Sequence, residues 1–133
     1  MNEEKLRTYW QAYTDGWLLI KNHERVQKKD ISDMIRKHSI GYMNRIFCLV
    51  VWQEIKNPEN MLPLDKYQAA FTGAWKIFRK YVVPNDSDVV CDALFDEINA
   101  LADRYNRNQF IRNLLIYVTL EEIDRNWRES KKL

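Results

Sequence analysis

The sequence predicts an all-α fold, in which residues 1–133 form a single domain, a bundle of about five helices. Glycine and proline number only three each, too few for the many tight turns that a sheet protein of this length needs. Hydrophobic residues make up 46% and aromatic residues 13%, which is enough for a well-filled core. Apolar side chains also recur at the three- and four-residue spacing of amphipathic helices along most of the chain.

The first predicted helix covers residues 3–27. One face carries its larger apolar side chains: Leu6, Tyr9, Trp10, Tyr13, Trp17 and Ile20. At this spacing the aromatic members are expected in the core, and a stacking platform for nucleic-acid bases is the alternative. Gly16 lies inside the helix at a cost of up to about 1 kcal/mol relative to alanine, which indicates a bend or a close contact with another helix.

The second predicted helix covers residues 31–56, with Asp30 as its N-cap and Pro58 beyond its end. Residues 46–52 are apolar on every side, so we expect other helices to enclose this segment. A buried strand is the competing interpretation of the same run. A helix is favoured because no turn signal separates the run from the helical pattern before it.

Three further helices complete the predicted bundle. The third has Asp65 as its cap, and residues 84–87 separate it from the fourth. The fifth follows a weak interruption at residues 106–108 and extends to about Glu129. We expect the apolar parts of the second and fifth helices to lie innermost. The fourth helix has a regular apolar stripe: Val90, Leu94, Ile98, Leu101 and Tyr105.

Composition excludes several classes of protein. The formal net charge is +2, without the basic excess that strong nucleic-acid binders show. Cys48 and Cys91 fall in helical patterns without a CxxC motif, so we expect reduced packing residues and a cytoplasmic protein. The longest apolar run, residues 46–52, is too short to span a bilayer, and no membrane partner is predicted.

Motifs for catalysis are missing from the sequence. It contains no phosphate-binding loop, dinucleotide fingerprint, nucleophile elbow or HExxH pair. The two histidines, His23 and His38, have polar neighbours and are expected at the surface or at its boundary. We therefore predict that the chain is not an enzyme and has no catalytic residue, no metal and no cofactor.

The fourth predicted helix carries four acids within one arc, on the side away from its apolar stripe: Asp88, Asp92, Asp96 and Asp103. Like charges four residues apart destabilise a helix by about 0.2–0.5 kcal/mol per pair. The structural interpretation is a solvated face, with or without bases of a neighbouring helix to neutralise it. The functional interpretations are a surface for a basic partner, or a Mg²⁺ site completed by the acids of residues 121–124.

A polar segment at residues 104–113 is the alternative site. At the start of a helix it gathers residue types that read base edges: Arg107, Asn108, Gln109 and Arg112. Lys28 and Lys29 would add phosphate contacts. The chain would then be a nucleic-acid-binding regulator. A polar helix boundary is the structural interpretation, since acids lie just upstream and the following helix is apolar enough to be buried.

Aromatic content points towards an interface. Five tryptophans and seven tyrosines can exceed what one core encloses, and a leftover aromatic side chain makes a good interface anchor. Trp127, beside Arg125 and Arg128, is the residue that we expect to play this part. Together, Trp127 and the acidic arc predict a small, non-catalytic protein-binding module. A homodimer formed through exposed aromatics would give the same pattern.

The C-terminal half carries one more pattern: Trp75, Phe78, Tyr81, the break Asp86-Ser87-Asp88, Tyr105, Phe110 and the end Glu121-Glu122-Ile123. In these residues, over positions 70–127, the chain resembles small helical proteins of Gram-positive phages and conjugative elements. Such proteins include inhibitors of host defence systems and small regulators. The resemblance implies no catalytic residue, and it implies a host defence protein, such as a nuclease of a defence complex, as the partner.

Overall fold

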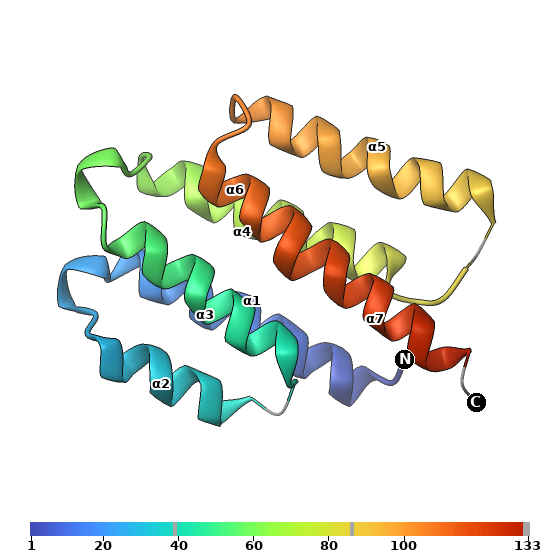
Figure 1. Ribbon diagram of the computed structural model, residues 1–133, viewed down its shortest axis with the longest axis horizontal. Coiled ribbons are helices and arrows are strands. Elements are labelled where there is room, and N and C mark those ends of the chain that lie inside the picture. The colour runs from blue at the N-terminus through green and yellow to red at the C-terminus, as the bar shows by residue number, and fades with distance from the viewer. Residues whose placement is uncertain (39, 86, 132–133) are drawn as a thin grey trace. The chain divides into compact units, whose positions relative to one another are not determined.

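The computed structural model describes residues 1–38, 40–85 and 87–131, and every regular element in these ranges is helical (Figure 1). Ser39, inside the predicted second helix, and Asp86, in the predicted break before the fourth, lie outside the described residues, as do residues 132–133. The all-α prediction is thus confirmed for the part of the chain that the structure describes, which contains no strand.

The separate long helices are α1 (Glu3–Lys21), α2 (Lys28–Lys37), α3 (Tyr42–Ile55), α4 (Leu64–Tyr81) and α5 (Asp88–Arg104). A continuous helical segment then runs through α6 (Gln109–Asn113), a π-helical stretch (Leu114–Leu120) and α7 (Glu121–Ser130). Short 3₁₀ turns lie at His23–Arg25 and Pro58–Asn60.

The single helix predicted over residues 31–56 is wrong, because two helices occupy this range. α2 ends at Lys37, where His38 is extended, and Gly41 adopts a φ of +60°, a conformation that favours glycine. The buried Asn44 side chain closes the junction. Its Nδ2 donates to the carbonyl oxygens of Met34 (3.0 Å) and Ile35 (3.1 Å) at the end of α2, and this satisfies groups that a helix end leaves orphaned.

The predicted helix ends also need correction. α1 ends at Lys21, where the Asn22 side chain donates to the carbonyl oxygen of Leu18 (2.9 Å), so residues 22–27 are a connector. Asp30 is not the N-cap of α2. Gln27 holds that position, and the Asp30 carboxylate accepts the backbone N–H of Gln27 (2.7 Å) from the third helical position. Asp65, predicted as the cap of α4, lies inside its first turn.

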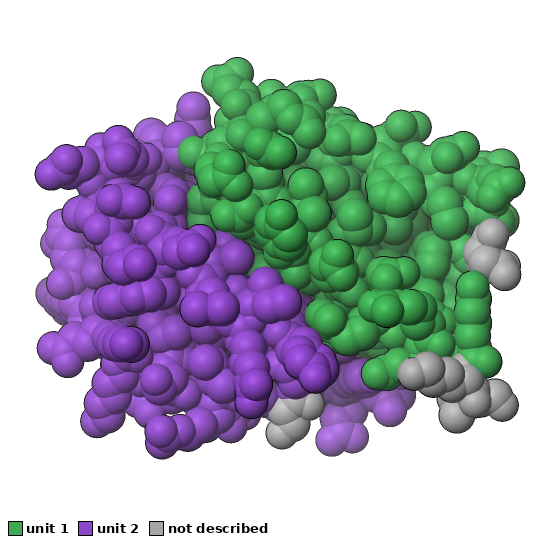
Figure 2. Space-filling model, viewed as in Figure 1, with its two compact units in different colours: residues 1, 72–133 green, residues 2–71 purple. Residues whose placement is uncertain are grey.

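The chain divides into two compact units, residues 2–71 (unit 2) and residues 1 and 72–133 (unit 1), which Figure 2 shows in different colours. The division falls within α4. α1, α2 and α3 belong entirely to unit 2, and α5 and the segment from α6 to α7 belong to unit 1. The single domain predicted from the sequence stays a prediction.

The core of unit 2 forms around Phe47 of α3. A Cβ on Gly16 of α1 would lie 2.4 Å from Phe47 Cε1, so the missing side chain lets the ring approach the α1 backbone. The ring stacks on Phe71 (centroids 5.9 Å apart) and meets Tyr13 edge-on (5.5 Å). The close contact predicted at Gly16 is confirmed. Of the predicted aromatic stripe, Tyr9 and Tyr13 are buried, whereas Trp10 is 49% exposed.

His38 belongs to the same unit and corrects another prediction. It was expected at the surface or its boundary, but its side chain is only 3% exposed. Its Nε2 lies 2.8 Å from Oδ2 of Asp15, a residue of α1. The partner comes from 23 positions earlier in the chain, and a buried polar ring needs such a partner.

In unit 1, α5 packs against the later part of α4 and against the π-helical stretch. A Cβ on Gly73 of α4 would lie 2.8 Å from Leu101 Cδ2, so these two helices also approach closely. The Tyr81 hydroxyl donates to the Glu97 carboxylate of α5, and Lys80 Nζ lies 3.2 Å from the same carboxylate. These contacts orient α5 within unit 1 and leave its other side free.

Both segments predicted to lie innermost contribute buried side chains to their own units. α3 buries Met43, Phe47 and Val51, and the π-helical stretch buries Leu114 and Leu115 among others. Each also has an exposed apolar residue, which sequence reasoning did not foresee: Leu49 (62% exposed) and Tyr117 (54% exposed). None of the helices in the described ranges has both the length and the apolarity to cross a membrane.

Candidate functional site

The outward side of α5 is the site that the structure supports best. Its helix begins at Ser87, whose Oγ accepts the backbone N–H of Val90 (3.2 Å) as an N-cap. The inner side buries four apolar residues: Leu94, Ile98, Leu101 and Ala102. At 3.6 residues per turn, the centre of the acidic arc lies almost opposite this buried stripe.

The four acids of the arc, Asp88, Asp92, Asp96 and Asp103, are all exposed. Only Asp103 has a cation beside it, since its Oδ1 lies 2.6 Å from Nη1 of Arg107. The other three make no hydrogen bond or ion pair with any described residue. No base of a neighbouring helix pairs with any of the four acids among the described residues, since Arg107 lies in the turn that follows α5. The exposure of the acids agrees both with a solvated face and with a surface for a basic partner.

Two apolar side chains share this surface, and sequence reasoning missed both. Phe95 is 49% exposed and Val89 is 79% exposed. At the pitch of an α-helix, they lie at the two edges of an arc of about 120° that contains the four acids. We call these six residues the α5 face. The available signal was that positions 89 and 95 fall outside the apolar stripe of the helix.

Glu97, the remaining acid of α5, lies off this face. The hydrogen bond from Lys80 to the Glu97 carboxylate raises the pKa of the Lys80 ammonium. Burial, and then the bond to Glu97, raise the pKa of the Tyr81 hydroxyl. Glu97 thus joins α5 to α4, whereas the α5 face is not needed for packing within unit 1.

Trp127, the predicted interface anchor, is half-buried in α7. Its Nε1 donates to the backbone carbonyl oxygen of Tyr81 (2.8 Å), so the indole ties α7 to the end of α4. Its part in binding stays a prediction. Among the described residues, the aromatic side chains with about half or more of their area exposed are others: Trp10, Tyr42, Phe95 and Tyr117.

The alternative nucleic-acid segment is a tight turn whose side chains have local roles. Asn106 and Arg107 adopt left-handed conformations (φ 56° and 52°), and Arg107 reaches back to Asp103. Asn108 caps α6, accepting the N–H of Ile111 (3.2 Å). The remaining members are engaged or covered: Gln109 donates to Asn113 (2.9 Å), and Arg112 has its Nε buried without a hydrogen bond.

The bases expected to assist that segment, Lys28 and Lys29, are exposed in the first turn of α2 and so belong to unit 2. Of the three acids considered as a second half of a Mg²⁺ site, Glu122 and Asp124 are paired within α7, and Glu121 is exposed. Glu122 is buried, with Oε1 2.8 Å from Nε of Arg125, and Asp124 lies 3.0 Å from Arg128. Over the described ranges, no group of three or more His, Cys, Asp or Glu side chains is arranged to hold a metal ion.

Titratable groups of unit 2 that have a raised pKa include the buried Cys48 thiol and the half-buried Glu54 carboxyl. Burial raises the pKa of the Cys48 thiol to about 11. Burial also raises the pKa of Glu54, whose carboxylate accepts the Tyr67 hydroxyl. Cys48 belongs to the core, whereas Glu54 is half-buried. Cys91 is half-buried on α5, and neither cysteine forms a disulfide.

Comparison with known proteins finds no match: no family model, no curated protein and no solved structure resembles the chain closely enough to be assigned.

Proposed function

We propose that this chain is a small, non-catalytic protein-binding module and that the α5 face binds a basic surface of its partner. One observation carries the proposal. Three carboxylates, Asp88, Asp92 and Asp96, have no partner among the described residues and share a helix face with the exposed side chains of Phe95 and Val89.

The two kinds of side chain have different parts in binding. The carboxylates repel one another at four-residue spacing, and a basic partner would relieve this repulsion. Their joint field would also accelerate the encounter with such a partner. Phe95 would supply the buried aromatic contact on which affinity at protein interfaces depends. The partner is therefore expected to offer lysine or arginine side chains around an apolar depression.

The resemblance to small proteins of phages and conjugative elements suggests which partner to test first, a host defence protein that the chain inhibits. The alternative is a nucleic-acid-binding regulator that uses residues 104–113. It is less well supported, because Arg107 already pairs with an acid and Asn108 caps a helix.

The test is affinity capture from a lysate of the host cell, with the wild type and two charge-matched variants. The first, Asp88→Asn/Asp92→Asn/Asp96→Asn, removes three carboxylates from the α5 face. The second is the control. It removes three exposed carboxylates that make no hydrogen bond or ion pair with any described residue and lie outside α5: Glu24→Gln, Glu59→Gln and Glu129→Gln. Light scattering of the purified chain runs in parallel, and the lysate is used with and without nuclease.

We expect the wild type and the control to retain one partner in the same amount, and the α5 variant to lose most of it. Retention by the α5 variant would refute the role of this face. A wild type that is monomeric and retains nothing would refute the protein-binding function. Capture that disappears after nuclease treatment, or on changing Arg107→Ala and Arg112→Ala, would favour the nucleic-acid alternative.

A further inference from the structure

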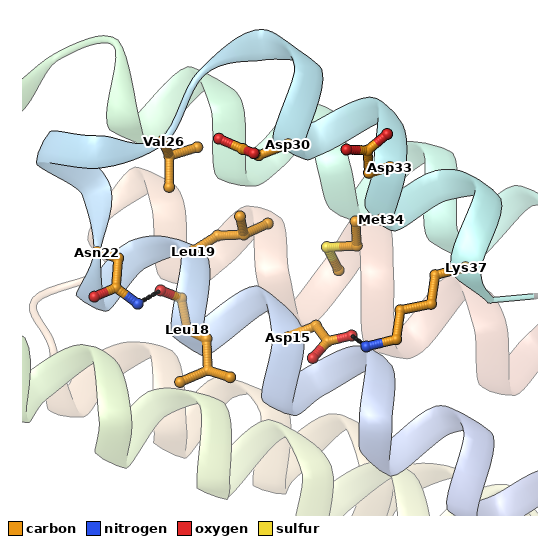
Figure 3. Close-up of a pocket in the computed structure, with 9 residues that line it drawn as sticks. All are labelled: Asp15, Leu18, Leu19, Asn22, Val26, Asp30, Asp33, Met34 and Lys37. Atoms are coloured by element: carbon orange, nitrogen blue, oxygen red, sulfur yellow. Dashed lines mark hydrogen bonds and ion pairs between the residues drawn. The ribbon is translucent and has the colours of Figure 1, made fainter.

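Unit 2 contains a pocket of about 290 Å³ between the second half of α1 and α2, open to solvent (Figure 3). The connector at residues 22–27 closes one end of it. Nine residues line the pocket: Asp15, Leu18, Leu19, Asn22, Val26, Asp30, Asp33, Met34 and Lys37. All of them belong to unit 2, so the pocket is complete within that unit.

The floor of the pocket is apolar. Leu19 of α1 and Met34 of α2 point into the space between the two helices, and Val26 points into it from the connector (Figure 3). Leu18 also lines the pocket and is 42% exposed, so part of this apolar surface is in contact with water. An apolar body that entered here would displace that water, which is favourable.

The rim of the pocket is acidic, and its charges are only partly compensated. Lys37 Nζ lies 3.3 Å from Oδ2 of Asp15, the same oxygen that contacts His38, so the Asp15 carboxylate already has partners within the protein. Asp30 accepts only the backbone N–H of Gln27 and has no cation beside it. Asp33 makes no hydrogen bond or ion pair with any described residue.

Asp30 and Asp33 are three residues apart on α2, so they lie on the same side of that helix. Figure 3 shows both carboxylates on the α2 side of the pocket. The pocket thus offers an apolar floor below two exposed carboxylates that lack a counter-ion in the described chain. This combination favours a cationic ligand over a neutral or an anionic one.

We propose that this pocket binds a small organic cation, an ammonium or amidinium attached to a compact apolar group. The apolar group occupies the floor beside Leu19 and Met34, and the cationic group lies between Asp30 and Asp33. Ligand-binding sites run from about 300 to 1,000 Å³, and the volume of this pocket lies at the lower end of that range. The apolar part of the ligand is therefore limited to about one ring or a short alkyl chain.

The proposal does not depend on the protein-binding function, because the pocket lies in unit 2 and the α5 face in unit 1. Three probes of similar size and different charge test it: 2-phenylethylammonium, 2-phenylethanol and 3-phenylpropionate. The readout is the NMR signal of ¹³C-labelled methionine methyl groups. The chain has four methionines, of which Met34 lines the pocket and the fully buried Met43 serves as an internal reference.

We expect the cation to shift the Met34 signal with an affinity about 3- to 10-fold higher than that of the alcohol, the range that two exposed ion pairs give. The carboxylate probe should bind weakest. Asp33→Asn should reduce the preference for the cation over the alcohol by about 2- to 5-fold and leave the affinity for the alcohol unchanged. Glu24→Gln, which removes an exposed carboxylate near the pocket but outside its lining, should leave all three affinities unchanged.

Four results would overturn the proposal. Met34 could remain unshifted by all three probes at millimolar concentrations, or the three could bind equally well. The carboxylate probe could bind tightest, which would assign the pocket to Lys37 and an anion. Finally, Asp33→Asn could retain the full preference for the cation, which would show that the rim carboxylates take no part.

Discussion

The contact between Gly16 and Phe47 can be tested by adding a single methyl group. In Gly16→Ala the new Cβ would lie 2.4 Å from Cε1 and 2.5 Å from Cζ of Phe47, where ordinary contact begins at 3.4 Å. Either the ring or the α1 backbone must therefore move by about 1 Å. The ring is fully buried, stacked on Phe71 and in edge contact with Tyr13, so it has little freedom to yield.

The expected loss follows from two opposing effects. Forcing an extra methyl group into a packed core costs about 1–3 kcal/mol. Replacing glycine by alanine inside a helix returns up to about 1 kcal/mol. We therefore expect Gly16→Ala to lower the free energy of unfolding by about 1–2 kcal/mol. Gly73→Ala is the matched control, because the only atoms nearer to its Cβ than ordinary contact would be the two terminal methyl groups of Leu101, at 2.8 and 3.2 Å. These groups form the far end of a flexible side chain, which can yield at less cost than a stacked ring.

The assay is urea unfolding of wild type, Gly16→Ala, Gly73→Ala, Phe47→Leu and the double variant Gly16→Ala/Phe47→Leu. If the contact is as described, the two changes at Gly16 and Phe47 are non-additive, and the alanine costs less once the ring has been removed. The control should leave the free energy of unfolding unchanged or raise it by up to about 1 kcal/mol, the gain from alanine inside a helix. A Gly16→Ala protein as stable as the wild type, or an additive cycle, would refute the packing of α1 on α3.

Three further predictions concern single side chains. Asn44→Ala should lower the free energy of unfolding by about 2–4 kcal/mol because it leaves buried carbonyl groups at the end of α2 without a donor. Asn44→Asp should be equally destabilised because a carboxylate cannot donate to these groups. Equal stability of either variant and the wild type in urea would contradict this. Cys91 should be alkylated before the buried Cys48 at pH 8, as mass spectrometry would show. Because the pKa of the folded Cys48 thiol is about 11 against an ordinary 9.0, the free energy of unfolding should fall as the pH rises from about 9 to about 11, and it should fall less steeply in Cys48→Ala. The same slope in Cys48→Ala and the wild type would count against the burial of this thiol. Asp92→Asn should raise the free energy of unfolding by about 0.4–1 kcal/mol at low salt by removing two repulsions of about 0.2–0.5 kcal/mol each, and no gain would mean that the acids of α5 do not interact.

Regular periodicity accounts for what the sequence predicted correctly. On α5 the spacing of Leu94, Ile98 and Leu101 identified the buried side, and these residues are buried. The acids on the opposite side could therefore be placed on one arc and are exposed. Gly16 could be recognised as a bend or a close contact because glycine inside a long helix is costly without such a reason, and the structure shows the close contact.

The break between α2 and α3 could not be predicted from periodicity, because apolar residues continue at helical spacing across it. Gly41 was the one local signal, and its positive φ became apparent only in the structure. What stabilises the break is the buried Asn44, through contacts with residues up to ten positions away. The burial of His38 likewise depends on Asp15, which is distant in sequence.

The site was predictable only in part. Sequence reasoning placed the acids but missed Phe95 and Val89, since an apolar residue outside the main stripe becomes informative only when its exposure is known. The pocket of unit 2 could not be foreseen, because its shape depends on where α1 ends and how the connector turns. The predicted first helix extended through that connector and would have left no pocket.

The most direct test of the proposed function is the rate at which the captured partner associates with the α5 face. Association would be measured for the wild type, for Asp88→Asn/Asp92→Asn/Asp96→Asn and for the control variant at Glu24, Glu59 and Glu129, at low and at high salt. Because electrostatic steering changes association rates by about 10-fold or more, we predict a loss of at least about 10-fold for the α5 variant at low salt, narrowing at high salt, and none for the control. Equal association rates for the α5 variant and the wild type at low salt would contradict the account.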